Sequence, residues 1–412
     1  MIPYSRQLIE DDDIEAVVSV LKSDYLTQGP VIEAFEAALA ANTGARHAVI
    51  FSSGTAALHA AYSVAGITKG DVVLTSPITF AATANAALYN GATPVFVDVE
   101  PDTGNMDGTL LEQAVGRRTK AIVPVHFAGH PVDMEPISRT ARQHGLIVIE
   151  DACHALGAEY RTTVTSDQLS VVSEEERDRG PGTGDRRNDW IKVGSCTHSD
   201  MTVFSFHPVK QITTGEGGAV LTNSADYYDR LRLFRAHGIT KDPSKFVIHH
   251  PTQDGEWYYE MQLLGFNYRM TDLQAALGLS QLRKVDRFIQ RRRTIAGQYG
   301  TALARHEYLT LPPERAYARS SYHLYPVRIS EEFVHRKDTI FSALREAGLG
   351  VQVHYIPVYL QPYYELIGYK KGLCPAAEMF YRKELSIPLH QAMDDTAVHT
   401  VIETVERVFG SL

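Results

Sequence analysis

Residues 47–67 read HAVIFSSGTAALHAAYSVAGI, a short apolar run followed by an alanine-rich stretch. The run is typical of a buried strand, and the stretch after it is typical of a helix. Further strand-like runs alternate with helical patterns along the chain, at 71–76, 93–100, 120–127 and 145–152. This alternation predicts an α/β fold in which helices flank a mostly parallel sheet.

Ligands of such sheets bind at the carboxyl ends of the strands. The residues that follow the apolar runs are therefore the first candidates for a functional site. They are Ser52–Thr55, Ile78–Phe80, His126, Asp151 and the segment that ends at Lys210.

The pattern changes after about residue 270. Helical and strand-like segments of another arrangement follow, at 271–303, 322–329, 338–349 and 350–358. The first of them is long enough to connect two domains. We therefore expect a large domain at 1–265 and a smaller α+β domain at 266–412 that includes the connecting helix.

Residues 161–189 interrupt the alternation with charged residues, glycine and proline, and their centre has no apolar periodicity. This composition predicts an exposed inserted loop. Two interpretations stay open, a solvated loop without function and a lid near the active site.

The composition excludes several classes of function. A net charge of -9 argues against nonspecific binding to nucleic acid or to anionic membranes. Cys153, Cys196 and Cys374 are too few and too scattered for a disulfide framework or a cysteine zinc site, so we expect no metal and a reducing cytoplasm. The chain shows neither the pattern of a signal peptide nor an apolar run long enough to span a membrane.

Residues 52–57 (SSGTAA) lie between a predicted strand and a predicted helix. Backbone N–H groups at the start of a helix, together with hydroxyl groups, can bind an anion, although the same residues can form an ordinary helix cap. Asp151 directly follows the apolar run LIVIE, where a carboxylate is costly unless it is paired. It could face a cationic ring nitrogen, bind a metal or cap the next helix. His154, one helical turn further on, could lie on the same side or be a core histidine.

Lys210 ends the alternating segment FSFHPVK, and the glycine-rich TTGEGG follows at 213–218. A lysine in a partly desolvated pocket loses proton affinity and becomes a nucleophile toward carbonyl groups. A lone lysine at this place would ordinarily be an exposed residue at the end of a strand. Residues 265–272 (GFNYRMTD) precede a helical pattern, in which Thr271 or Asp272 could be a cap.

Together these segments offer an anion site, a carboxylate for a ring nitrogen, a nucleophilic amine and further polar groups. Pyridoxal 5'-phosphate needs this set, because different parts of a chain hold its phosphate, ring nitrogen and aldehyde. The combination therefore predicts this cofactor, held as a Schiff base on Lys210.

The order and spacing of the segments resemble the DegT/DnrJ/EryC1/StrS family of sugar aminotransferases, within the fold-type I enzymes that use pyridoxal 5'-phosphate. The strings FSFHPVKQITTGEGGAV and GFNYRMTDLQAALGLSQL are specific for that family. The resemblance covers nearly the whole chain except 161–189. It implies that an amino acid, typically glutamate, passes its amino group to the cofactor, from which a keto sugar receives it.

The resemblance also implies roles for individual residues. Lys210 matches the lysine that holds the cofactor and moves protons, and Asp151 matches the partner of the ring nitrogen. The other matches are Thr55, Ala56 and Ser205 for the phosphate, Phe80 for stacking on the ring, His154 near the phenolic oxygen, Asn267 for the phosphate of a neighbouring subunit and Arg269 for a donor carboxylate. The match of Asn267 implies a homodimer with shared active sites.

A narrower resemblance points to the branch of the family that serves pseudaminic acid synthesis. It rests on MIPYSRQLIEDDDIEAVVSVLKSDYLTQGP, EWYYEMQLLGFNYRMTD and VQVHYIPVYLQPYY. It implies that glutamate aminates C4 of a UDP-linked 4-keto-6-deoxy-N-acetyl hexose, giving UDP-4-amino-4,6-dideoxy-N-acetyl-β-L-altrosamine. His354 and Tyr355 would then lie in the sugar pocket.

Three alternatives remain. The first is an aminotransferase for another 3-keto or 4-keto nucleotide sugar. The second is a sugar dehydratase that uses the same cofactor, in which a histidine replaces the lysine that this chain keeps as Lys210. The third is a regulator without catalytic activity, which would have little physical reason to keep Lys210, Asp151 and the phosphate segment, because such a site is costly when it is unpaired.

Overall fold

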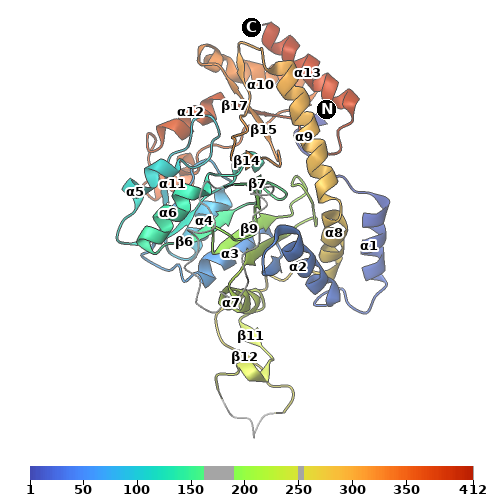
Figure 1. Cartoon of the computed structure of the whole chain (residues 1–412), viewed down its shortest axis with the longest axis vertical. Helices are drawn as coiled ribbons and strands as arrows, with labels where there is room; N and C mark the ends of the chain where they lie inside the picture. The colour runs from blue at the N-terminus through green and yellow to red at the C-terminus, as the bar shows by residue number, and fades with distance from the viewer. Residues whose placement is uncertain (162–189, 249–254, 412) are drawn as a thin grey trace, which may run out of the picture.

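The computed structural model describes residues 1–161, 190–248 and 255–411 (Figure 1). Its centre is a seven-stranded sheet with the strand order β2-β10-β9-β6-β5-β3-β4. Only β10 runs antiparallel to its neighbours in this sheet. The strands are β2 (His47–Phe51), β3 (Val72–Thr75), β4 (Thr93–Phe96), β5 (Thr119–Val123), β6 (Ile147–Asp151), β9 (Met201–Ser205) and β10 (Gly218–Thr222). The predicted α/β fold is confirmed.

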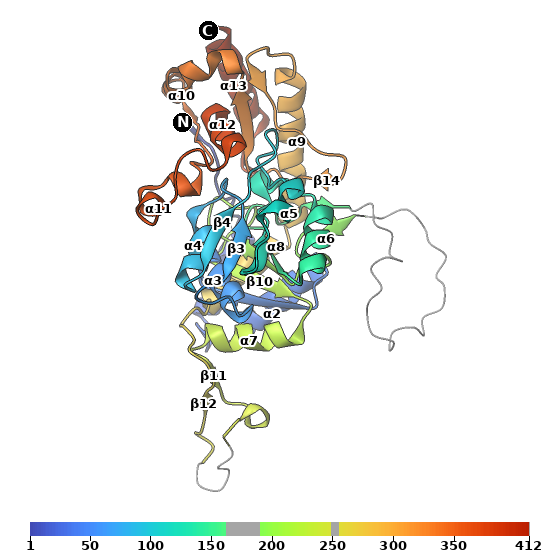
Figure 2. The same cartoon turned by 90° about the vertical axis from the view of Figure 1, so that its left-hand side faces the viewer.

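The two faces of this sheet bury different side chains, because successive residues of a strand point to opposite sides. In β2, Ile50 belongs to one apolar core, whereas Val49 and Phe51 belong to the other. Helices cover both cores and complete a three-layer arrangement (Figure 2). The first core is covered by α2 (Pro30–Thr43), α6 (Met134–His144) and α8 (Asp272–Leu282), and the second by α3 (Gly54–Val64), α4 (Ala81–Tyr89) and α7 (Ala225–Arg235).

A third apolar core lies in the C-terminal part of the chain. It is built on a three-stranded antiparallel sheet of order β13-β15-β17 and the helices packed on it. Its elements are β13 (Leu309–Thr310), β15 (Tyr325–Ile329), β17 (Glu384–Ile387), α9 (Val285–Leu303), α10 (Lys337–Glu346) and α13 (Asp395–Gly410). Strand β1 (Ile2–Pro3) pairs in parallel with β16 (Leu349–Gly350), so both termini lie at this end of the molecule (Figure 1).

Two of the remaining helices, α11 and α12, contribute to a fourth apolar core with Phe96 and Phe127. A second three-stranded sheet has the order β14-β7-β8, and the hairpin of β11 and β12 projects from the end opposite the termini (Figures 1 and 2). The elements are α1 (Asp11–Leu21), α5 (Leu111–Ala114), α11 (Pro362–Leu366), α12 (Pro375–Lys383), β7 (Glu159–Tyr160), β8 (Ile191–Lys192), β11 (Ile239–Thr240), β12 (Glu260–Met261) and β14 (Ala318–Arg319). No helix in the described part of the chain is both long enough and apolar enough to cross a bilayer.

Two segments differ from the sequence prediction. The helical pattern at 271–303 forms two helices, α8 and α9, and the chain turns at Lys284, whose Nζ lies 2.7 Å from carboxylate oxygens of Asp12 and Asp13. The strand predicted at 350–358 does not form as a continuous strand: Gly350 ends β16, and Gln352 forms an isolated bridge with Ser386 of β17. The N–H of His354 donates to the side-chain oxygen Oε2 of Glu384 on β17 at 2.7 Å and not to a backbone carbonyl oxygen.

The division into domains at residue 265 stays a prediction. Helix α9 passes from the first core, which contains Phe288, to the third core, which contains Ile295. Of the predicted inserted loop, residues 162–189 lie outside the described residues.

Asp272 is a buried carboxylate that joins two helices. It is the first residue of α8, but its oxygens accept the N–H groups of Gly29 at 2.8 Å and Val31 at 3.1 Å, at the start of α2. Thr271 caps α8 itself and forms a capping box with Gln274. Of the two caps that the sequence suggested for α8, Thr271 is therefore the one that forms, whereas Asp272 caps α2.

We expect Asp272→Ala to lower the free energy of unfolding by about 1–3 kcal/mol, because two backbone N–H groups lose their acceptor. Urea denaturation followed by circular dichroism measures the change. Asp395→Ala is the control, because the side chain of Asp395 is 79% exposed in its ion pair with Arg291. Unchanged stability of Asp272→Ala would show that this cap contributes nothing.

Candidate active site

A cavity of about 450 Å³ lies where the carboxyl ends of β6 and β9 meet the starts of α3 and α4. It is lined by side chains from the N-terminal segment, from the sheet and from the segment that follows β16. The predicted site residues in its wall are Thr55, Phe80, Asp151, His154, Ser205, Lys210, His354 and Tyr355. The tertiary structure therefore brings together predicted site residues that are up to 300 positions apart in the sequence, since Thr55 and Tyr355 share this wall.

The start of α3 forms one end of the cavity. Ser53 is its N-cap and accepts the N–H of Ala56 at 3.1 Å. A Cβ atom added to Gly54 would lie 2.9 Å from Cβ of Ser205, so only glycine lets the helix start come this close to the end of β9. The N–H groups of a helix start and two hydroxyl groups, those of Thr55 and Ser205, thus lie at one place, where an anion is favoured.

Asp151 forms the floor of the cavity as a buried carboxylate at the end of β6. The hydroxyl of Thr83 donates to Oδ2 of Asp151 at 2.5 Å, and the N–H of Cys153 donates to Oδ1 at 3.1 Å. Thr79 and Thr83 are themselves joined through their hydroxyl groups at 2.7 Å. These hydrogen bonds hold the carboxylate in one orientation and offset part of the free-energy cost of burying it.

Lys210 follows β9 and reaches the same cavity. Burial lowers the pKa of Lys210, against the opposing effects of Cys153 and Asp151. The neutral amine is therefore more populated than in an exposed lysine. Two hydrogen bonds hold the backbone around Lys210. The Lys210 N–H donates to the carbonyl oxygen of His207 at 2.9 Å, and the Ser5 hydroxyl donates to the carbonyl oxygen of Val209 at 2.7 Å.

His154 and Tyr355 form a second wall. The Tyr355 hydroxyl and Nε2 of His154 are 3.2 Å apart and share a hydrogen bond. Burial, with smaller contributions from Lys210 and His354, holds the pKa of His154 well below its usual range, so this imidazole is neutral. Nδ1 of His154 is buried and has no hydrogen-bond partner among the described residues.

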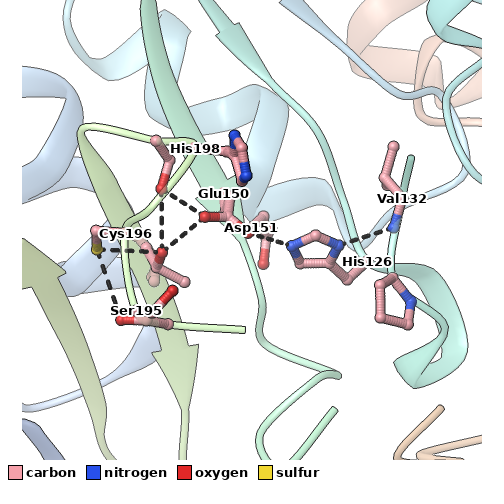
Figure 3. A network of polar contacts seen from close by, with 12 residues as sticks. His126, Val132, Glu150, Asp151, Ser195, Cys196 and His198 are labelled. Atoms are coloured by element: carbon pink, nitrogen blue, oxygen red, sulfur yellow. Dashed lines mark hydrogen bonds and ion pairs between the residues drawn. The ribbon is translucent and has the colours of Figure 1, made fainter. Parts of the chain in front are cut away.

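Behind Asp151 lies a buried polar network on the other face of β6 (Figure 3). The N–H of Val132 donates to Nδ1 of His126 at 3.0 Å, so the ring proton is on Nε2 and donates to Glu150 at 2.7 Å. Burial opposes ionisation of Glu150, but hydrogen bonds from His126, Ser199 and Thr202 hold its pKa below the usual value. His126, a candidate site residue from its position in the sequence, instead helps to hold β6 in place through its hydrogen bond to Glu150.

The comparison with protein families agrees with this geometry. The sequence pattern of the DegT/DnrJ/EryC1/StrS aminotransferase family matches residues 7–406. The chain belongs to this family. It is therefore an aminotransferase that uses pyridoxal 5'-phosphate, as the sequence predicted.

Relatives within this family cover the chain almost completely. The spore coat polysaccharide biosynthesis protein SpsC of Bacillus subtilis is 39% identical over 99% of this chain and 97% of its own length. The UDP-4-amino-4,6-dideoxy-N-acetyl-beta-L-altrosamine transaminase of Campylobacter jejuni is 39% identical over 96% of this chain and 94% of its own. Among solved structures, PseC of Helicobacter pylori, an aminotransferase involved in the biosynthesis of pseudoaminic acid, has a TM-score of 0.86 at 34% identity and covers 100% of both chains.

The cavity of this family member fits pyridoxal 5'-phosphate. Because Gly54 has no Cβ atom, the start of α3 can lie close to Ser205, and this arrangement leaves room for an anion at the start of α3. A half-buried lysine and a buried carboxylate, Lys210 and Asp151, line the same cavity. These are the groups that an aldehyde and a cationic ring nitrogen require.

Three predicted site residues do not line this cavity. Ala56 lies beside it in α3, and its N–H donates to Ser53. Asn267 is exposed in this single chain. Arg269 lines a separate cavity of about 750 Å³ between α2 and α7. The roles assigned to these three residues stay predictions.

The sequence missed several residues of the cavity. Tyr4 reaches it because β1 pairs with β16, and Thr83 on α4 reaches it through its hydrogen bond to Asp151 at the end of β6. Neither carries a local signal, since both depend on segments that meet only in the folded chain. Cys153 lies two residues after Asp151 in the segment EDACH, so its place in the wall could have been read from the sequence.

We expect Thr83→Val to lower turnover about 10- to 100-fold, because Asp151 loses a hydrogen bond worth about 1.5–3 kcal/mol for a charged acceptor. Thr83→Ser keeps the hydroxyl and should retain most of the activity. Steady-state kinetics of the two variants, at matched cofactor content, give the comparison. Equal activity of the valine and serine variants would exclude a role for this hydrogen bond.

Proposed function

We propose that this aminotransferase moves an amino group from L-glutamate to C4 of a UDP-linked 4-keto-6-deoxy-N-acetyl hexose. The product would be UDP-4-amino-4,6-dideoxy-N-acetyl-β-L-altrosamine, for pseudaminic acid synthesis. The observation that carries the proposal is the full-length identity of 39% to a transaminase named for this product. The structural similarity to PseC over the whole chain supports it.

Lys210 is the residue that we assign to proton transfer. Burial lowers the pKa of Lys210, so a free amine is available to take a proton from the substrate carbon and to return it. The same amine holds the cofactor between turnovers. Bound pyridoxal 5'-phosphate supplies an electron-withdrawing ring and stores the amino group between the two half-reactions.

The other residues of the cavity bind and orient. Asp151, fixed by Thr83, pairs with the ring nitrogen, and the start of α3 with Thr55 and Ser205 holds the phosphate. Ala56 is assigned to the phosphate as well. Phe80, whose side chain is 63% exposed at the mouth of the cavity, covers the ring.

The remaining assignments concern the substrates. His154, held by the Tyr355 hydroxyl, lies near the phenolic oxygen of the cofactor in this proposal. His354 and Tyr355 contact the sugar, and Arg269 receives the carboxylate of glutamate.

The proposal includes a homodimer in which Asn267 reaches the phosphate of the partner's site. Two observations support this assembly. Asn267 is exposed and does not line the cavity of its own chain. The neighbouring segment carries large exposed apolar side chains, among them Leu264, at 78% exposure, and Phe266. A cytoplasmic location is part of the proposal and is consistent with three free cysteines.

A second keto nucleotide sugar is the alternative substrate. The observation that favours it is the relative SpsC, which is as similar to this chain as the altrosamine transaminase and is named for spore coat polysaccharide synthesis. A different sugar would use the same Lys210 and Asp151 and would differ only in its contacts with the pocket.

The test is product analysis with L-glutamate and the UDP-linked 4-keto-6-deoxy sugar, in parallel with other 3-keto and 4-keto nucleotide sugars. We expect amination at C4 of the first compound, with the highest kcat/KM, identified by mass spectrometry and NMR. Lys210→Ala should lose turnover by at least about 10⁴-fold, because no other amine lines the cavity in the described residues. A higher kcat/KM with another sugar would select the alternative.

Mixing of subunits tests the shared site. An equimolar mixture of Lys210→Ala and Asn267→Ala chains, each inactive or weak alone, should regain up to about a quarter of the wild-type activity, because about half of the dimers are mixed and one of the two sites in each mixed dimer has neither change. Refolded or co-expressed mixtures are compared with each variant alone. Failure to regain activity in dimers shown to be mixed would place Asn267 outside the partner's site.

A further inference from the structure

A row of three buried side chains leads from the third core to the active-site cavity. Glu384 and Ser386 lie on β17, and His354 lies in the segment after β16. Ser386 Oγ lies 2.5 Å from Oε1 of Glu384 and 2.8 Å from Nδ1 of His354. The other oxygen of Glu384 accepts the N–H of His354 at 2.7 Å, so the carboxyl group holds both the backbone and, through Ser386, the ring.

The hydroxyl of Ser386 has only one proton, which couples its two hydrogen bonds. If Glu384 is ionised, it can only accept, so Ser386 donates to it and must accept a proton from Nδ1 of His354. Nε2 of His354 then carries a lone pair. If Glu384 is protonated on Oε1, it donates to Ser386, Ser386 donates to Nδ1, and the ring proton must lie on Nε2.

Nε2 is the atom of this row that a ligand can reach. His354 lines the cavity, and within the described residues no hydrogen bond involves its Nε2. The ring is held in place by Tyr4, whose centroid is 5.3 Å away, and by Tyr355, whose centroid is 4.8 Å away. The ring therefore presents one nitrogen to the cavity and keeps the other on Ser386.

The ionisation states of His354 and Glu384, the two ends of this row, permit the coupling. Burial, together with the positive charge of Lys210, lowers the pKa of His354 to about 3, so the ring stays neutral and only its tautomer changes. Burial raises the pKa of Glu384 to about 8, against the hydrogen bonds from Ser386 and the His354 N–H and the charge of Lys337. Both forms of Glu384 are thus populated near neutral pH.

Among the described residues, three further titratable groups lie near Glu384. They are Lys337 on α10, the Tyr355 phenol and Arg328, which is opposite Glu384 on β15. Lys337 donates to the Tyr381 carbonyl oxygen at 2.6 Å, and Arg328 donates to that of Pro101 at 3.0 Å. Both side chains therefore have hydrogen-bond acceptors of their own.

We propose that Glu384 and Ser386 are positioning residues that determine which ring nitrogen of His354 carries the proton. Nε2 of His354 accordingly accepts a hydrogen bond from the acceptor sugar when Glu384 is ionised and donates one to it when Glu384 is protonated. The identity of the ligand as a sugar rests on the proposed function, whereas the coupling rests on the three side chains alone.

The first experiment measures the tautomer directly, on the cofactor-loaded enzyme with ¹⁵N-labelled histidine. Long-range ¹H–¹⁵N spectra distinguish the two tautomers, and the signal that is lost in His354→Phe is that of His354. Between about pH 6 and about pH 10, two units on either side of the Glu384 pKa, the proton should move from Nε2 to Nδ1 as the pH rises. A tautomer that does not change over this range would overturn the coupling.

Glu384→Gln is the matched variant. The glutamine amide can keep the hydrogen bond from the His354 N–H, but its NH₂ group must donate to Ser386. This variant should therefore keep the Nε2–H tautomer at every pH. Ser386→Ala should likewise remove the pH-dependent change, because the connection between Glu384 and the ring is lost. A pH-dependent change that persists in either variant contradicts the proposal.

Kinetics test the consequence for the sugar. At about pH 6, Glu384→Gln and the wild type should have the same KM for the keto sugar, and at about pH 10 their KM values should differ about tenfold, the effect of one mismatched hydrogen bond. The KM for glutamate should stay the same in both. Equal values for the sugar at both pH limits would overturn the contact with Nε2. Glu331→Gln, on the exposed ion pair with Lys383, is the control.

These readouts separate the inference from the proposed function. A tautomer that follows Glu384 in an enzyme that prefers another keto sugar would retain the coupling and reject only the named substrate. A fixed tautomer in an enzyme that makes the altrosamine product would retain the named substrate and reject the coupling.

Discussion

The hydrogen bond between Thr83 and Asp151 is the interaction on which the active site depends. A carboxylate at the end of a buried strand is stable only if donors surround it, and the hydroxyl of Thr83 supplies one at 2.5 Å. Because Thr83 lies on α4 and Asp151 on β6, the contact also places the start of α4, with Phe80, at the edge of the cavity. On the opposite face of β6, the ionised Glu150 and His126 hold the same strand (Figure 3).

Burial also shifts pKa values, because it disfavours the charged form of each group. It therefore lowers the pKa of a base and raises that of an acid. It lowers the pKa of Lys210 and of His154 and His354, and it raises the pKa of Glu384. The cavity thus combines a more available amine with neutral imidazoles. Each imidazole has a hydrogen-bond partner, the Tyr355 hydroxyl for His154 and the Ser386 hydroxyl for His354.

The C-terminal part of the chain contributes to the cavity through irregular structure. Residues 350–358 look like a strand in the sequence, but past Gly350 they do not continue β16, and the N–H of His354 binds Glu384. This departure from a strand turns His354 and Tyr355 toward residues of the central sheet. The N-terminal segment closes the same side, because pairing of β1 with β16 carries Tyr4 to the cavity.

The sequence by itself determined the sheet, the helices that flank it and the residues at the carboxyl ends of its strands, among them Asp151 and Lys210. Those features follow from local periodicity and from the rule that a parallel sheet exposes its strand ends on one edge. Only the tertiary structure decided the partners of these residues, such as Thr83 for Asp151 and Ser386 for His354. The physical reason is that a side-chain hydrogen bond depends on distance in space, and segments far apart in the sequence acquire such distances only when their apolar faces pack.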